Sequence, residues 1–275
     1  MNKIIVRNDD IYLDQSDDSI VFSVSKKNKF LNVKNVNIKV KKDTEIVMEC
    51  ADAIDIKLDI CVNVLKDVHA RIFEFKNVGN YKYQYRYYLE KDSYLSVEKV
   101  IDADNNLENV LINLNGENAK VDFNLKTISK MHEKYNFLVY HNAKKTFSNI
   151  INNGVNIKDG VLEFNVSTFI PNGVKKCDAS QSGRIINETS NECVIKPNLF
   201  IDENDVIANH SALIGTFSED EIFYLMSRGI GKKEAQSLLT KGFLLKGISY
   251  HKEKLEDIIN KYWRWLEWIG MILIF

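Results

Sequence analysis

The chain has 275 residues, with 37 Lys or Arg and 38 Asp or Glu, so its formal net charge is −1. A charge so close to zero excludes binding to nucleic acid through bulk electrostatic attraction. No apolar run reaches the roughly 20 residues that cross a bilayer, and the first residues do not resemble a signal peptide. We therefore expect a cytoplasmic protein outside the membrane, whose cysteines are reduced.

Alternating apolar and polar residues predict β-strands from residue 33 to about residue 210. Within 54–64 every even position is apolar, and within 81–87 every odd position is a tyrosine. This period of two places one side of each strand in a core. Strand starts recur about every 10–15 residues, a spacing that a sandwich, a barrel and a β-solenoid share.

Asn, Asp and Gly separate these runs and predict turns. The predicted turns are Gly79-Asn80, Asp104-Asn105-Asn106, Asn115-Gly116, Asn152-Asn153-Gly154 and Asp159-Gly160. Tight Asn-Gly and Asp-Gly turns favour hairpins, which counts somewhat against a solenoid. The pattern of residues alone does not decide between the three architectures.

Helical periodicity begins after the last strand. Ser218 and Glu221 form a capping box, the apolar stripe of the helix is Ile222, Leu225 and Met226, and Gly229 follows as the residue that ends it. We therefore place a boundary that divides the chain into a β-core, 1–214, and a helical domain, 215–275.

Two more helices are expected in the helical domain. The first runs from Lys232 to Thr240 and stops at Gly242. Its inward residues are Ala235, Leu238 and Leu239, and the third helix has an apolar face made of Leu255, Ile258, Ile259, Tyr262, Leu266 and Ile269. The apolar end, 265–275, is too short to span a bilayer. We interpret it as a docked helix or an oligomer contact, with attachment to a membrane surface as the alternative.

One segment carries the most specific pattern in the chain. Residues 207–243 read IANHSALIGTFSEDEIFYLMSRGIGKKEAQSLLTKGF, in which a strand containing His210 leads into a helix with the motif FYLMSRGI. This segment resembles the C-terminal signature of the SufB/SufD family, the scaffold subunits of an iron–sulfur cluster assembly machine. The resemblance implies a mainly β fold: a right-handed parallel β-helix (β-solenoid) core with a small C-terminal α-helical domain.

Weaker matches precede the signature in the family's order. They are the segments 141–148, 153–164, 175–182 and 196–206. In the SufB branch a glutamate follows the signature histidine, whereas this chain has Ser211 and is closer to the SufD-like pattern. The SufB branch carries a cysteine some six positions before the proline that corresponds to Pro197. Here Asn191 occupies that position, and Cys193 lies two residues nearer to Pro197.

The resemblance and the chemistry of the side chains indicate three candidates for cluster or sulfur chemistry. Thiolates and imidazoles bind iron in clusters, so His210 and Cys193 are candidate metal ligands for a transient iron–sulfur cluster. Cys193 and Cys177 are candidate sulfur acceptors, because a thiolate is the attacking species. The competing interpretations are a hydrogen-bonded histidine at a strand end and buried thiols, and for Cys50 and Cys61 we expect core packing.

The family's C-terminal helices dock onto SufC, an ABC-type ATPase. The resemblance therefore assigns ATPase docking to Phe223, Tyr224, Arg228 and Gly229, with packing of the helices onto the coil as the competing interpretation. No nucleotide-binding loop is present, because the segment 229–232 lacks the P-loop spacing. ATP hydrolysis would then belong to the partner.

We predict a non-enzymatic scaffold subunit that forms a homodimer or pairs with a second SufB/SufD-type subunit. One alternative is an adaptor of the same fold that binds and stimulates the ATPase without a cluster. The other is a β-helix enzyme acting on carbohydrates, for which Asp55, Lys57 and Asp59 share a strand face. A solvated polar face is the preferred explanation of these three residues.

Overall fold

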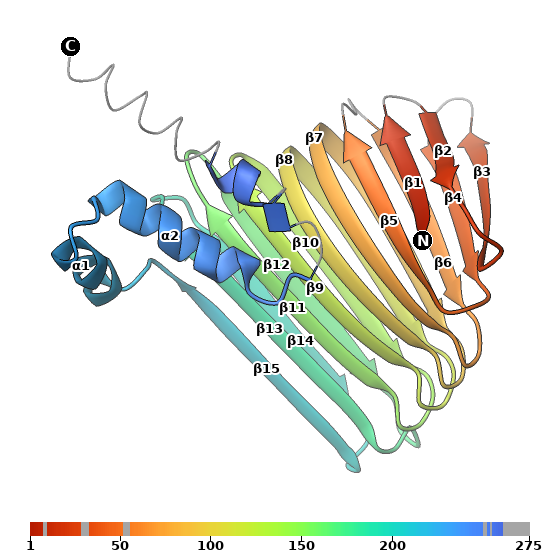
Figure 1. The fold of residues 1–275 in the computed structure, drawn as a ribbon. Coiled ribbons are helices and arrows are strands. Elements are labelled where there is room, and N and C mark those ends of the chain that lie inside the picture. Colours follow the sequence, from red (N-terminus) through yellow and green to blue (C-terminus); the bar gives the residue numbers. More distant parts are fainter. Residues whose placement is uncertain (8–9, 29–32, 52–55, 250–251, 254, 261–275) are drawn as a thin grey trace.

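In a computed structural model, the chain forms a β-solenoid of about seven turns with few helices, which lie near the C-terminus (Figure 1). This confirms the predicted fold class. The structure describes residues 1–7, 10–28, 33–51, 56–249, 252–253 and 255–260. The expected helical positions Tyr262, Leu266 and Ile269 and the apolar end 265–275 lie outside these residues.

The first strands are β1 (Asn2–Arg7), β2 (Asp10–Gln15), β3 (Ile20–Asn28), β4 (Val33–Val40), β5 (Thr44–Ala51), β6 (Ile56–Val64), β7 (His69–Leu89) and β8 (Tyr94–Leu114). The later strands are β9 (Lys120–Ser129), β10 (His132–His141), β11 (Phe147–Asn156), β12 (Val161–Ile170), β13 (Cys177–Asn187), β14 (Val194–Ile201) and β15 (Val206–Gly215). The helices are α1 (Glu219–Ser227) and α2 (Lys232–Leu245).

The strands stack into two facing sheets. The first sheet has the order β15-β13-β11-β9-β8-β7-β5-β1-β2, and the second contains β14, β12, β10, β8, β7, β6, β4 and β3. Most pairs are parallel, with β1–β2 and β3–β4 antiparallel. Each coil pairs in register with the next, as His69 does with Tyr94 and Tyr94 with Lys120. Apolar side chains from both sheets fill the space between them.

Three of the predicted turns are wrong, because the chain continues as a strand through each of them. β7 pairs with β5 before Gly79 and with β6 after Asn80, so this strand crosses from the first sheet to the second at that point. Residues 104–106 lie within β8 in the same way, and 152–154 lie within β11. Gly154 is required by packing rather than by a turn, since a Cβ there would lie 2.2 Å from Leu162 Cδ2. The predicted turns at 115–116 and 159–160 do lie between strands.

The two ends of the solenoid differ. At the N-terminal end each sheet finishes in an antiparallel strand, β2 in the first and β3 in the second. At the C-terminal end β14 pairs with β12 and β15 pairs with β13, and among the described strands the opposite edge of each has no partner. An unpaired edge is a template for pairing with another chain.

The interior is not purely apolar. Glu74, Lys76, Lys99 and Glu108 are almost completely buried inside the coil. Lys76 Nζ lies 3.2 Å from a Glu74 oxygen and 2.6 Å from a Glu108 oxygen, and Lys99 Nζ lies 3.0 Å from Glu74 and 2.5 Å from Glu108. Each charge therefore contacts two opposite charges. We call these four residues the interior quartet.

Helix α2 lies over the outer side of the first sheet, and α1 lies beside α2, beyond the end of β15 (Figure 1). Gly229, at φ +85°, follows Arg228, the residue that caps the C-terminus of α1, as predicted. The predicted end of the second helix is wrong, since α2 continues through Gly242 to Leu245. The cost of about 1 kcal/mol for a glycine inside a helix is opposed by packing of Leu244 and its neighbours on the sheet.

Two of the predicted inward positions are also wrong. Met226 is 44% exposed and Leu238 is 42% exposed. Ala235 and Leu239 do pack inward, as does Ile222. Residues 255–260 are helical, and Leu255, Ile258 and Ile259 are buried, as expected for the third helix. Among the described residues, no helix has the length and apolar character to span a bilayer.

Candidate functional site

His210 lies at the open C-terminal end of the coil. It is on β15 and pairs with Gln181 of β13, whose side chain is 2% exposed and points inward. Paired residues of adjacent strands share a face of the sheet, so the imidazole lies at the mouth of the interior. Gln181 Nε2 donates to Thr168 Oγ1 at 2.7 Å and to the Asn198 carbonyl at 3.1 Å, while Gln181 Oε1 has no partner.

Cys193 directly precedes β14 and packs within the main apolar core. It is 8% exposed, and burial raises the pKa of its thiol, with a smaller opposing effect from the Leu162 backbone N–H. A raised pKa favours the protonated thiol over the nucleophilic thiolate. In this conformation Cys193 is therefore poorly prepared to accept sulfur or to bind iron.

Cys177 belongs to a buried hydrogen-bonded cluster. Its sulfur lies 3.2 Å from Thr146 Oγ1, which lies 2.8 Å from His141 Nδ1. The other imidazole nitrogen, Nε2, lies 2.9 Å from Ser148 Oγ. Burial lowers the pKa of His141 to about 4, so its imidazole is neutral at physiological pH. The sequence indicated His141 only as part of a matching segment, since nothing in the pattern places it beside Cys177.

The structure does not bring the three candidates together. Cys177 and His210 are on adjacent strands, but Cys177 pairs with Val206, four residues before His210, which corresponds to roughly 13 Å along the strand. Cys193 precedes a strand of the opposite sheet. Among the described residues, no group of three or more His, Cys, Asp or Glu side chains could hold a metal ion.

The remaining cysteines differ from each other. Cys50 is fully buried, as predicted, and burial raises the pKa of its thiol to about 12. The expectation of core packing is wrong for Cys61, which is only partly buried. Its strand neighbours Ile60 and Val62 are the ones that point inward, so the alternation places Cys61 on the outer side of the second sheet.

Helix α1 presents the predicted docking residues to solvent. Phe223 is 72% exposed and Tyr224 is 59% exposed, and the Arg228 guanidinium lies 5.3 Å from the centroid of the Tyr224 ring. None of the nine residues of α1 is buried. A helix that exposes two aromatic rings and an arginine has the composition of an interface anchor.

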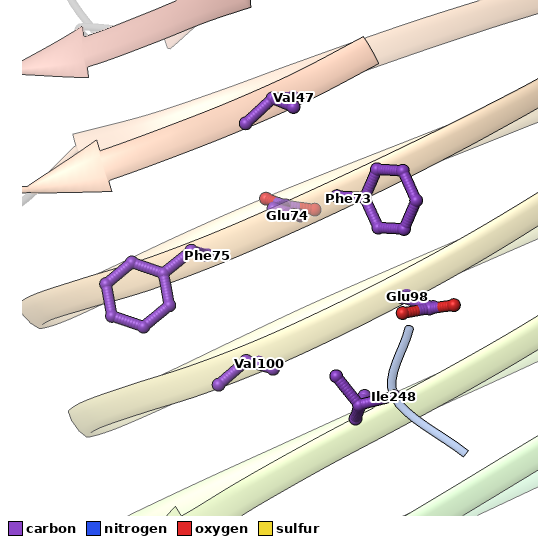
Figure 2. A pocket seen from close by; sticks show the side chains of 7 residues that line it. All are labelled: Val47, Phe73, Glu74, Phe75, Glu98, Val100 and Ile248. Atoms are coloured by element: carbon purple, nitrogen blue, oxygen red, sulfur yellow. The ribbon is translucent and has the colours of Figure 1, made fainter. Parts of the chain in front are cut away.

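The segment after α2 is fixed to the first sheet by polar contacts beside a small apolar pocket. Figure 2 shows Ile248 among Phe73, Phe75 and Val100, in a pocket of about 20 Å³. A volume of this size accommodates no more than a water molecule. Nearby, Glu98 accepts hydrogen bonds from Ser249 N and Oγ at 2.9 and 2.6 Å, and Asn124 Nδ2 donates to the Gly247 carbonyl at 3.0 Å. The pocket is therefore a helix-docking contact rather than a cofactor site.

Comparisons with known proteins agree with the sequence pattern. The family model described as "SUF system FeS cluster assembly, SufBD core domain" matches residues 59–243. The iron–sulfur cluster assembly protein SufD of Bacillus subtilis is 34% identical over 147 residues, which cover 52% of this chain and 33% of the relative. SufD of Escherichia coli is 27% identical over 138 residues, which cover 49% of this chain and 33% of the relative.

A SufBD family protein of Galdieria sulphuraria, ycf24, is 26% identical over 133 residues, which cover 47% of this chain and 60% of the relative. The alignments with the two SufD proteins span about a third of the length of those relatives. The matched region of the family model includes the open end of the coil, α1 and most of α2.

Proposed function

Because the chain belongs to the SufB/SufD family, we propose that it is a scaffold subunit of a Suf-type iron–sulfur cluster assembly complex. The scaffold is not an enzyme, and it acts in the cytoplasm. One observation carries the proposal beyond family membership: a single stretch of chain joins the open end of the coil, which contains His210, to the solvent-exposed helix α1. A scaffold needs both a surface for a motor partner and a surface for the cluster.

The motor partner is a SufC-like ABC ATPase, and it docks on α1. Phe223 and Tyr224 supply apolar contact area, while Arg228 supplies donors and charge. Gly229 lets the chain leave the helix at a positive φ. No nucleotide binds to this chain in the proposed complex.

Replacing Tyr224 and Arg228 together by alanine should abolish binding of the ATPase in a pull-down. Both side chains are exposed, so the variant should retain the circular dichroism and unfolding midpoint of the wild type. A matched control is Lys145→Ala, which removes an exposed charge from a turn of the coil. Undiminished binding by the double variant would remove the docking assignment.

The coil pairs with a second SufB/SufD-type coil, identical or related, through its open end. β14 contains Pro197, which has no N–H to donate, whereas β15 contains no proline and offers a more complete edge. On the outer side of the second sheet, Tyr140 and Phe169 stack at 4.7 Å and Phe169 and Phe200 at 4.8 Å. Phe200 ends this stack and is 53% exposed, so a second coil would cover it.

The nascent cluster forms at this shared end as the scaffold's cargo. His210 is the ligand that this chain places at the mouth of the coil. Cys193 and Cys177 serve as ligands or sulfur acceptors only if the end of the coil opens, because both thiols are buried in the described conformation. ATP-driven movement of the docked ATPases would provide that opening.

The second candidate function is an adaptor that binds and stimulates the ATPase but carries no cluster. The burial of both thiols and their separation from His210 favour it. Of the residues considered for a carbohydrate-active enzyme, Asp59 is paired with Arg86 at 2.8 Å, and Asp55 lies outside the described residues. The ion pair favours the interpretation of Asp59 as part of a structural face.

A further inference from the structure

Three polar side chains form an inward-facing column on successive coils of the second sheet. Tyr81 of β7 pairs with Asn106 of β8, and Asn106 pairs with Glu133 of β10. The three residues are 6%, 5% and 1% exposed. Paired positions on adjacent strands lie about 4.8 Å apart, so each of these side chains can reach the next by rotation about its own bonds.

The column contains an unusual concentration of buried polar atoms without partners. Glu133 Oε2 accepts from Thr127 Oγ1 and from Tyr135 Oη, both at 2.6 Å, but Glu133 Oε1 has no partner. Both amide atoms of Asn106 and the Tyr81 hydroxyl are also unpaired. Buried polar atoms without partners are costly, so a cluster of four calls for a function or a compensating change.

Glu133 also differs from the other interior carboxylates. Glu74 and Glu108 are each paired with both Lys76 and Lys99, so the interior quartet is neutral by itself. An ionised Glu133 would add one uncompensated negative charge to this interior. The charged groups that act on Glu133, Lys130 and Asp102, form an ion pair with each other at 2.7 Å.

We propose that the Tyr81–Asn106–Glu133 column is an internal proton-binding site, in which the Asn106 amide rotates to serve both protonation states of Glu133. With the proton on Oε1, Glu133 donates to Asn106 Oδ1, and Asn106 Nδ2 donates to the Tyr81 hydroxyl. Without it, Asn106 Nδ2 donates to the carboxylate, and the Tyr81 hydroxyl donates to Asn106 Oδ1. Loss of the proton to solvent therefore reverses the direction of both hydrogen bonds and leaves neither partner unmatched.

The electrostatics of the site agree with this geometry. Burial raises the pKa of Glu133 to about 7, an effect that the hydrogen bonds from Thr127 and Tyr135 and the charge of Lys130 partly oppose and that Asp102 reinforces. Glu108, two residues after Asn106 on β8, pairs with Tyr135 and is held by both lysines. The other groups that face the column are Tyr83 and Thr127, which are uncharged at neutral pH, and Lys76 of the interior quartet, whose Nζ lies 4.8 Å from the centroid of the Tyr81 ring.

The site is tested by following the Glu133 carboxyl carbon in NMR spectra of the full chain labelled with ¹³C-glutamate, between pH 4 and 9. We expect a midpoint near 7, in a signal that Glu133→Gln removes. Asn106→Leu keeps the volume but deletes the amide, which stabilises the ionised form more strongly, so the midpoint should rise by roughly one unit. Tyr81→Phe should move it in the same direction by less.

Two results would overturn the proposal. One is a titration midpoint of Glu133 at the ordinary glutamate value. This midpoint is measured on the wild-type chain, so the result does not depend on the folding of any variant. The other is a midpoint that stays unchanged in both Asn106→Leu and Tyr81→Phe, which would show that the column does not respond to the proton. If Glu133→Gln does not fold, Thr127→Val assigns the signal, because loss of the Thr127 hydrogen bond should raise the same midpoint.

Discussion

Replacing Lys76 by methionine should lower the free energy of unfolding by about 3–5 kcal/mol, the usual cost of removing one member of a buried ion pair. The methionine fills a similar volume, so the loss comes from the charges left behind. Glu74 and Glu108 would each retain only Lys99 as a positively charged partner, inside a coil where their side chains are fully buried. Glu74 would also keep the hydrogen bond from the Tyr85 hydroxyl. Urea denaturation followed by circular dichroism measures the change.

Two further variants separate the charge from the packing. Lys145→Met removes a lysine whose ion pair with Glu117 is exposed, and it should leave the denaturation midpoint nearly unchanged. Combining Lys76→Met with Glu108→Gln restores the balance of charge, so the double variant should be less destabilised than the sum of the two single variants. Strict additivity of the two changes would contradict the account of the interior quartet.

The stability of the chain should fall relative to that of Glu133→Gln as the pH rises from about 4.5 to about 7. Burial raises the pKa of Glu133 from the ordinary glutamate value of 4.5 to about 7, so the folded state binds this proton more tightly than the unfolded state does. The stabilisation is complete below pH 4.5, declines as the pH approaches 7 and is lost above it. Its size is about 3 kcal/mol.

This difference is measured by denaturing both proteins in urea at several pH values. The comparison with Glu133→Gln cancels other groups that titrate in the same window, including His141, whose pKa is lowered to about 4. A stability difference that stays constant between pH 4.5 and pH 8 would show that Glu133 ionises equally easily in both states.

The strands were predictable because apolar and polar residues alternate along the chain as buried and outward-facing positions alternate along a strand. Tyr81, Tyr83, Tyr85 and Tyr87 occupy alternate positions, and all four are buried inside the coil. The corners were not predictable from local residues. Gly79-Asn80 is a typical turn dipeptide, yet the ladder to the neighbouring coils continues on both sides of it, so pairing with other coils determines the conformation there.

The candidate site was predictable only in part, for a similar reason. The motif around His210 and the exposed face of α1 are contiguous in sequence, so a pattern could indicate them. The interior quartet and the Tyr81–Asn106–Glu133 column are brought together by coils that repeat about every 25–30 residues. Lys76 and Glu108 carry no signal of their contact, because each lies in an otherwise ordinary alternating strand.

The central claim is tested most directly by anaerobic co-expression of the chain with a SufC-like ABC ATPase, followed by measurement of mass, iron and acid-labile sulfide on the purified complex. We expect a stable complex with two coils, in which iron and sulfide occur in similar amounts and are reduced by His210→Ala and by Cys193→Ala. A stable complex that contains no iron or sulfide, even after reconstitution, would contradict the proposed scaffold function and support the adaptor function. The absence of any complex with the ATPase would contradict both.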